Sequence, residues 1–187
     1  MGNGIVESLK KEFFITDEWI SYEIHPDTPK QGTDLSGRFP PEQADAMTQR
    51  LQEMGTPYGL TFGKLNLLAN SRNALQASEF ARDEGRFHEF HQRIFEAYFR
   101  DGRDIGDDEV LYEVARLSGL DVPRLQNALS NRRYEQRLYA AQQEGQMYEV
   151  TGTPTFIIND TYKLVGAQPP EVFRQAFRQL EQNSGTQ

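Results

Sequence analysis

The sequence predicts an α/β fold in which a long helical block separates two shorter segments that contain strands. Three observations support this prediction. Apolar residues about one helical turn apart over residues 5–13 indicate an amphipathic helix, and apolar and polar residues then alternate in EWISYEIHP, residues 18–26. Residues 64–148 have a helical pattern almost throughout, whereas TFIINDTYKLV, residues 155–165, indicates a hairpin of two short strands.

The alternating segment near the N-terminus predicts a half-buried strand. Ile20, Tyr22 and Ile24 alternate with Ser21 and Glu23. Because successive side chains of a strand point to opposite faces, we expect the three apolar residues to face the core.

The helix boundaries of the middle region follow from capping signals. A helix is expected to begin at Pro40 or Pro41, because proline is tolerated in a first turn. Asp107 and Asp121 are predicted N-caps. Gly119 is predicted to end a helix in the left-handed conformation, which makes LSGLD a tight turn between two helices.

The last region predicts a hairpin followed by a helix. Its turn is expected at Asn159–Asp160, and the final helix is expected to start near Pro169 or Pro170. Pro154 directly precedes the most strand-like run of the chain, although proline cannot donate to a sheet ladder. From Asn183 the tail is polar and is expected to fray.

The composition limits the possible functions. A length of 187 residues predicts one domain, or one domain with an insertion, and a formal net charge of −8 argues against nucleic acid or an anionic membrane as partner. Without a signal-peptide pattern or an apolar run of about 18 residues, the chain is expected to be cytoplasmic. The sequence has no cysteine, which excludes disulfides, thiolate zinc sites and cysteine nucleophiles for this chain.

Four stretches resemble one family: HPDTPKQG (25–32), AYFRDGRDIGDDEVL (97–111), SGLD (118–121) and VTGTPTFIINDTYKLVGAQPPEVF (150–173). With them the chain resembles the DsbA-like thioredoxin-fold oxidoreductases, and within these the cytoplasmic FrnE-type branch, which is related to 2-hydroxychromene-2-carboxylate isomerase. The resemblance implies a thioredoxin-like fold with a large all-helical insertion.

The resemblance also implies a division of the chain into three parts. Residues 1–63 would form the N-terminal part of the thioredoxin-like domain, residues 64–148 the helical insertion, and residues 149–187 the C-terminal part.

For the Thr153–Pro154 bond, base rates alone favour an ordinary trans proline that opens a strand. The family resemblance instead implies a cis bond, whose turn presents the backbone of Thr153 to an extended substrate. Thr153 and Pro154 are therefore the predicted substrate-binding residues.

The family's chemistry is thiol–disulfide exchange by a Cys-x-x-Cys pair at the start of the first helix, where the helix end stabilises the thiolate. The resemblance aligns Met1–Gly2 with the end of that stretch, so the chain is expected to begin just after the motif, without the first strand. No catalytic residue is predicted, and the chain is expected to be inactive in this exchange.

A missing interior strand would leave unpaired backbone groups in the sheet. Two repairs are expected as alternatives. Residues 19–24 could pair directly with residues 155–158, or a segment of a second chain could fill the gap, which would make a homodimer.

Other candidate sites have simpler explanations. His88 and His91, with Glu84 one turn earlier, could present metal ligands on one helix face, but no further ligand completes a set, and no metal is predicted. His25 stands in a turn at the end of the predicted strand, where a structural role is expected. Ser8 lies inside the first helix and not at its start.

Two small basic stretches, SLKKEF (8–13) and RRYEQR (132–137), are expected to be solvated helix faces.

Three functions remain open. The first is a DsbA-family oxidoreductase, of which this chain keeps the fold and the substrate-side loop. The second is a glutathione-dependent isomerase or transferase of the 2-hydroxychromene-2-carboxylate isomerase type, and the third is a non-catalytic peptide-binding module. The expected partner is an extended polypeptide or a small thiol or disulfide substrate, with a possible homodimer and no cofactor.

Overall fold

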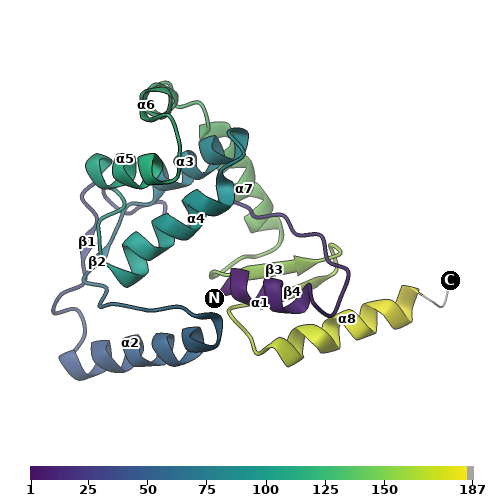
Figure 1. Ribbon diagram of the computed structural model, residues 1–187. Helices are drawn as coiled ribbons and strands as arrows, with labels where there is room; N and C mark the ends of the chain where they lie inside the picture. Colours follow the sequence, from purple (N-terminus) through teal and green to yellow (C-terminus); the bar gives the residue numbers. More distant parts are fainter. Residues whose placement is uncertain (185–187) are drawn as a thin grey trace. The chain divides into compact units, whose positions relative to one another are not determined.

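The computed structural model describes residues 1–184, which form a mixed α/β fold rich in helices (Figure 1). Its helices are α1 (Gly2–Leu9), α2 (Pro41–Gly55), α3 (Arg72–Asp83), α4 (Phe87–Phe95), α5 (Asp108–Leu117), α6 (Val122–Ser130), α7 (Glu135–Met147) and α8 (Pro170–Ser184). A 3-10 turn, η1, covers Thr56–Tyr58, and a π-helix, η2, covers Glu96–Arg100. The strands are β1 (Thr33–Asp34), β2 (Leu67–Leu68), β3 (Thr155–Ile158) and β4 (Tyr162–Val165).

The chain forms two compact units. One combines residues 1–19 with the chain from Glu144 onward, and the other comprises residues 20–143. The predicted division at residues 63 and 148 stays a prediction, because compactness does not show which residues belong to a thioredoxin-like half. The predicted frayed tail starts at Asn183, and its last three residues lie outside the described chain.

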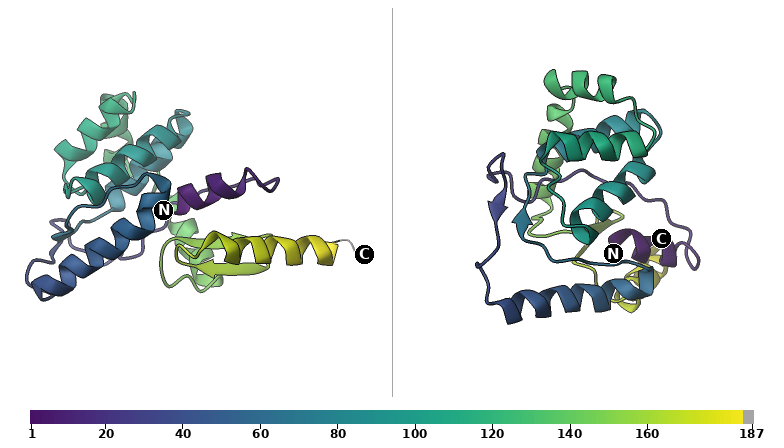
Figure 2. Two further views of the ribbon diagram at one scale, coloured as in Figure 1. Left: turned by 60° about the horizontal axis from the view of Figure 1, so that its bottom comes forward. Right: turned by 60° about the vertical axis from the view of Figure 1, so that its left-hand side comes forward.

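The first unit is built on the antiparallel hairpin of β3 and β4. Phe156 of β3 packs edge-on against Phe173 of α8, with ring centroids 4.8 Å apart. Phe13, just after α1, packs against Phe177 of α8 at 5.0 Å, and Ile5 is buried. Helix α8 therefore carries the apolar contacts to both the hairpin and the N-terminal helix, and it lies beside the hairpin in Figures 1 and 2.

The hairpin turn lies at the predicted residues. Asn159 and Asp160 have φ angles of 48° and 55°, and the Thr161 amide donates to the Ile158 carbonyl at 3.1 Å. Two successive positive φ angles define a type I′ turn, whose twist matches that of the flanking strands.

The second unit has its core around α3, which packs against α4, α5 and α6. Its centre is formed by side chains that are at most 1% exposed: Ala77, Phe80, Ala81, Phe90, Leu111, Ala115, Leu125 and Tyr134.

The predicted helix caps are confirmed. The Asp107 carboxylate accepts from the amides of Glu109 and Val110, and the Asp121 carboxylate accepts from the amide of Arg124. Gly119 has a φ of +77°, which fits the predicted left-handed helix end.

The predicted strand over residues 20–24 is wrong in two ways. The segment forms no strand, and its side chains face the opposite way from the prediction. Ser21 and Glu23 are buried, whereas Ile20 is 47% exposed. The polar residues face inward because they form hydrogen bonds with charged side chains of α3. The alternation of apolar and polar residues does not reveal such partners.

Direct pairing of residues 19–24 with β3 is therefore also wrong for this structure. Among the described residues, β3 forms a sheet only with β4, and the remaining sheet is the short unpredicted pair of β1 with β2. The alternative, a segment from a second chain, stays a prediction.

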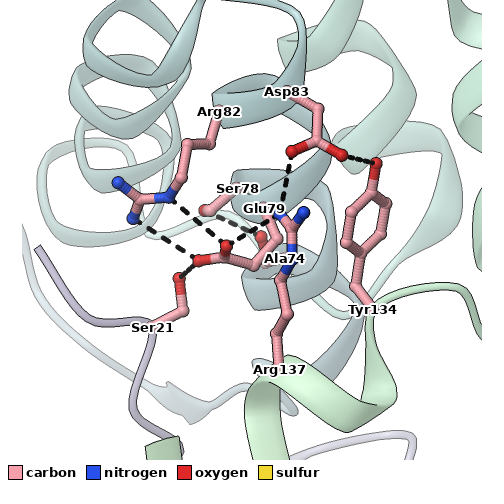
Figure 3. A network of polar contacts seen from close by, with 8 residues as sticks. All are labelled: Ser21, Ala74, Ser78, Glu79, Arg82, Asp83, Tyr134 and Arg137. Atoms are coloured by element: carbon pink, nitrogen blue, oxygen red, sulfur yellow. Dashed lines mark hydrogen bonds and ion pairs between the residues drawn. The ribbon is translucent and has the colours of Figure 1, made fainter.

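Polar side-chain contacts, and not the hydrogen bonds of a strand, hold the segment that contains Ser21 and Glu23. Figure 3 shows the part of this network around Ser21 and Glu79. The Ser21 hydroxyl donates to the Glu79 carboxylate at 2.6 Å, and Arg72 donates to Glu23 at 3.3 Å. The backbone carbonyl of Glu23 accepts from the side-chain amide of Gln142 at 2.5 Å. Side chains of α3 and α7 thus hold residues 21–23 in place within this unit.

The network continues to Asp83 of α3. This carboxylate accepts from Arg137 and from the Tyr134 hydroxyl, both at 2.9 Å (Figure 3). Burial raises the pKa of Tyr134 to about 12, and the hydrogen bond to Asp83 adds to this effect. Burial alone would raise the pKa of Asp83, but the bonds from Arg137 and Tyr134 outweigh it and leave that pKa lowered. The prediction that RRYEQR is a solvated face is wrong for Tyr134, which is 1% exposed, whereas the side chain of Arg137 is 47% exposed.

We expect Tyr134→Phe to lower the free energy of unfolding by about 1.5–3 kcal/mol, the usual value of a hydrogen bond to a charged group. Tyr134 is 1% exposed, so in the folded protein its hydroxyl depends on Asp83 for a hydrogen-bond partner. Urea denaturation followed by circular dichroism measures the change. Tyr139→Phe on α7, which begins directly after Tyr134, is the control, because Tyr139 is 60% exposed and should change stability by less than about 0.5 kcal/mol. Equal effects of the two variants would contradict the assigned network.

Helix α2 is the least buried helix of its unit, with Gly55 as its one buried residue. Met47 is 54% exposed and Met54 38%. The C-terminal end of α2 is fixed by Gln52, whose side chain donates to the Leu60 carbonyl at 3.0 Å and accepts from the Phe62 amide at 2.9 Å. The rest of α2 stands apart from the other helices of this unit in the right-hand view of Figure 2.

Within residues 1–184, no helix combines the length and the apolar character that crossing a membrane requires.

Candidate substrate-binding loop

The predicted substrate-binding residues lie in the loop that joins α7 to β3. The loop is anchored at its start, where the Val150 amide donates to the Gly145 carbonyl at 2.8 Å. Lys163 of β4 donates to the carbonyls of Tyr148 and Glu149 at 2.9 and 3.3 Å. Lys163 could not be singled out from the sequence, because a lysine in a strand pattern gives no sign of backbone partners outside the sheet.

At its other end the loop is fixed to the hairpin. The Thr155 hydroxyl donates to the Gly152 carbonyl at 2.6 Å, and the Pro154 carbonyl accepts from the Gly166 amide at 2.7 Å. The Thr153–Pro154 peptide bond, predicted to be cis from the family resemblance, is cis in the structure. Proline therefore stands one residue before β3, where its missing amide hydrogen removes one bond of the ladder.

Thr153 presents free backbone groups at this point. It is exposed, and within residues 1–184 neither its amide nor its carbonyl takes part in a backbone hydrogen bond. The carbonyl of the next residue, Pro154, is by contrast paired with the Gly166 amide of the hairpin.

The first turn of α1 lies against the loop. A Cβ atom on Gly2 would be 3.3 Å from Cβ of Pro154 and 3.5 Å from the ring of Phe156. Glycine at this position lets the start of the helix approach the proline closely. The start of α1 and the Thr153–Pro154 loop therefore pack against each other within the first unit.

No side chain in this arrangement can perform thiol–disulfide exchange, because the chain has no cysteine. Ser8 lies in the last turn of α1, away from the helix start, as predicted. What the loop offers is a hydrogen-bond donor and acceptor on the backbone of Thr153, beside the rigid ring of Pro154. This chemistry suits the backbone of an extended peptide.

The histidine candidates lie elsewhere, on α4. His91 stacks on Phe95 with ring centroids 4.4 Å apart, and His88 contacts Phe87 at 5.7 Å. Glu84, the third candidate ligand, makes two hydrogen bonds with Arg124, at 2.7 and 2.9 Å. Among the described residues no three potential ligands gather into a group that could hold a metal ion.

His25 forms a turn at the end of the segment that was predicted as a strand. Its carbonyl accepts from the amide and the hydroxyl of Thr28, at 3.2 and 2.9 Å.

Comparisons with known proteins agree with this architecture. Residues 6–178 match the family model of the DSBA-like thioredoxin domain. An uncharacterized protein of Bacillus subtilis (strain 168), YwbO, is 29% identical over 182 residues, which cover 94% of this chain and 88% of YwbO. The crystal structure of a probable DsbA oxidoreductase from Streptomyces coelicolor, SCO1869, has the same fold with a TM-score of 0.83. It is 24% identical, and the match covers 100% of this chain and 84% of that one.

Proposed function

Because the chain belongs to the DSBA-like thioredoxin-domain family, we propose that it binds extended polypeptide segments through the backbone of Thr153. One observation carries the proposal: Thr153 is exposed, and within residues 1–184 its amide and its carbonyl make no backbone hydrogen bond. A peptide that lies antiparallel to Thr153 would accept from its amide and donate to its carbonyl.

A disulfide oxidoreductase binds its polypeptide substrate and exchanges disulfides with it, and the proposed function is the binding alone. The family's enzymes must hold a polypeptide near a reactive thiol, and this chain has the loop without the thiol. The proposal includes membership of the FrnE-type branch and the cytoplasmic location that goes with that resemblance. The proposed peptide binding is supported by the family match and by the backbone groups of Thr153.

A binding measurement with two variants tests the proposal. The probe is a fluorescently labelled, unfolded polypeptide whose cysteines are carboxymethylated, and its anisotropy reports binding. Thr153→Pro removes the amide donor and should weaken binding about five- to tenfold, the equivalent of one hydrogen bond.

Thr151→Pro is the matched control, because Thr151 is exposed in the same loop and its amide makes no backbone hydrogen bond within the described residues. It should bind like the unchanged protein. A second probe, N-methylated at alternate amides, should also bind more weakly, because it cannot form the second hydrogen bond. If both variants bind equally, or N-methylation has no effect, the Thr153 backbone is not the binding site.

A further inference from the structure

The two ends of the 20–143 unit are joined to each other within that unit. Residues 20–23 are its first residues, and Gln142 is its second-last residue. The side-chain amide of Gln142 donates to the backbone carbonyl of Glu23 at 2.5 Å. Whatever holds or releases Glu23 therefore acts on both ends of the unit.

The carboxylate of Glu23 is buried and shares its cationic partner. Glu23 is 4% exposed, and its carboxylate lies 3.3 Å from the guanidinium of Arg72 on α3. Arg72 also lies 3.9 Å from the carboxylate of Glu135 on α7, which is 3.9 Å from Arg132. The Arg72 side chain is 46% exposed, so water weakens its attraction for Glu23.

The neighbouring attachment of the same segment is better compensated. The Ser21 hydroxyl donates to the Glu79 carboxylate of α3 at 2.6 Å. Glu79 in turn lies 3.3 Å from Arg82 and 3.4 Å from Arg137. Two arginines thus surround Glu79, whereas Glu23 competes with another carboxylate for one. Of the two buried carboxylates at this segment, Glu23 is the one whose charge is poorly balanced.

The charge of Glu23 is therefore unfavourable in the folded unit. Burial raises the pKa of Glu23 above its ordinary value of 4.5, and the opposing effect of Arg72 is smaller. A carboxyl whose pKa is higher in the folded than in the unfolded state stabilises the fold fully below the unfolded pKa. This contribution is lost as the pH rises through the folded pKa. The ionised carboxylate favours any state in which it reaches water.

We propose that Glu23 is a pH-sensitive switch for residues 20–24. As a neutral acid it keeps this segment against α3 and α7. When it gives up its proton to water, a larger fraction of molecules releases the segment, and the hydrogen bond from Gln142 is lost with it. The inference does not rest on the proposed function, because Thr153 lies in the other unit.

Cleavage by thermolysin, which cuts before large apolar residues, measures the released fraction. Tyr22 and Ile24 are half-buried, so cleavage before them requires local opening. Mass spectrometry locates the cuts. The rate is divided by that of a synthetic peptide of residues 16–28, which removes the pH dependence of the protease itself. We expect this ratio to rise with pH above the isoelectric point of 5.0.

Three variants assign the effect. Glu23→Gln keeps the size of the side chain and cannot ionise, so its ratio should not change with pH. Glu18→Gln is the matched control, because Glu18 is exposed in the same stretch, and His25→Gln removes the nearby histidine. Both should keep the pH dependence. A ratio that does not change with pH in the unchanged protein, that still changes in Glu23→Gln, or that stops changing in His25→Gln would overturn the proposal.

Titration of the unchanged protein tests the switch without relying on a variant. The carboxyl carbon of Glu23, assigned by heteronuclear NMR on isotope-labelled protein, reports its ionisation directly. Its midpoint should lie above 4.5. The amide resonances of residues 20–24 and of Gln142 should shift with the same midpoint. A midpoint at or below 4.5, or shifts that follow a different midpoint, would contradict the proposed switch.

Discussion

Purified protein of this sequence is expected to show no oxidase or reductase activity toward dithiol or disulfide substrates. Exchange proceeds by attack of a thiolate on a disulfide sulfur, and this chain has no thiol. The structure adds that the start of α1, where a helix end would stabilise a thiolate, carries Gly2 against Pro154. Insulin reduction and catalysed refolding of a reduced substrate measure the two directions.

An enzyme of this family that has a Cys-x-x-Cys pair serves as the positive control in the same assays. Turnover by the cysteine-free chain above the rate without enzyme would contradict the prediction. Such a result would require a nucleophile other than sulfur.

The largest effect on stability is expected for Phe90→Ala. Phe90 of α4 is 0% exposed and lies in the core of the 20–143 unit. Removing most of a buried ring costs about 3–5 kcal/mol, because the lost contacts are only partly replaced when the cavity relaxes. A typical domain is stable by about 5–15 kcal/mol, so the variant should unfold at markedly lower urea concentration or fail to accumulate.

Phe95→Ala on the same helix is the matched control. Phe95 is 48% exposed and contacts the rings of His91 and Phe99. Its loss should cost about 1 kcal/mol, the value of aromatic contacts at a partly exposed position. Circular dichroism at increasing urea compares the two, and a similar loss in both would mean that α4 does not bury Phe90 as described.

Local signals in the sequence predicted much of the fold. Asp107, Asp121 and Gly119 act at helix ends through contacts within a few residues, so their roles could be predicted from spacing alone. The hairpin turn at Asn159–Asp160 is equally local. The match of the chain to the DSBA-like thioredoxin domain agrees with the predicted fold family.

Contacts between distant residues could not be predicted in the same way. Ser21 is buried because Glu79, 58 residues later, accepts a hydrogen bond from its hydroxyl. Alternation of apolar and polar residues indicates an extended segment, but it does not say which side meets the core when a buried charge provides a partner. Tyr134 of RRYEQR was misjudged for the same reason, since its partner Asp83 lies on another helix.

The candidate site likewise combines a local feature that the sequence predicts with a contact between distant residues that it does not. Pro154 before an apolar strand pointed to the loop, and the family resemblance supplied its role. The contact of Gly2 with Pro154 joins residues at opposite ends of the chain, and only the folded structure brings them together.

Helix α2 differs from its neighbours in how its folding is coupled to the rest of the chain. Fifteen residues form it, and Gly55 is its one buried residue. Little buried apolar area becomes exposed to water when α2 unravels. Its opening is therefore governed by the helix–coil equilibrium of a short peptide, and an isolated helix of this length is only marginally stable. Helix α3 opens only when the core is disrupted. The 20–143 unit therefore contains a segment that can melt and re-form many times while the core around it stays folded.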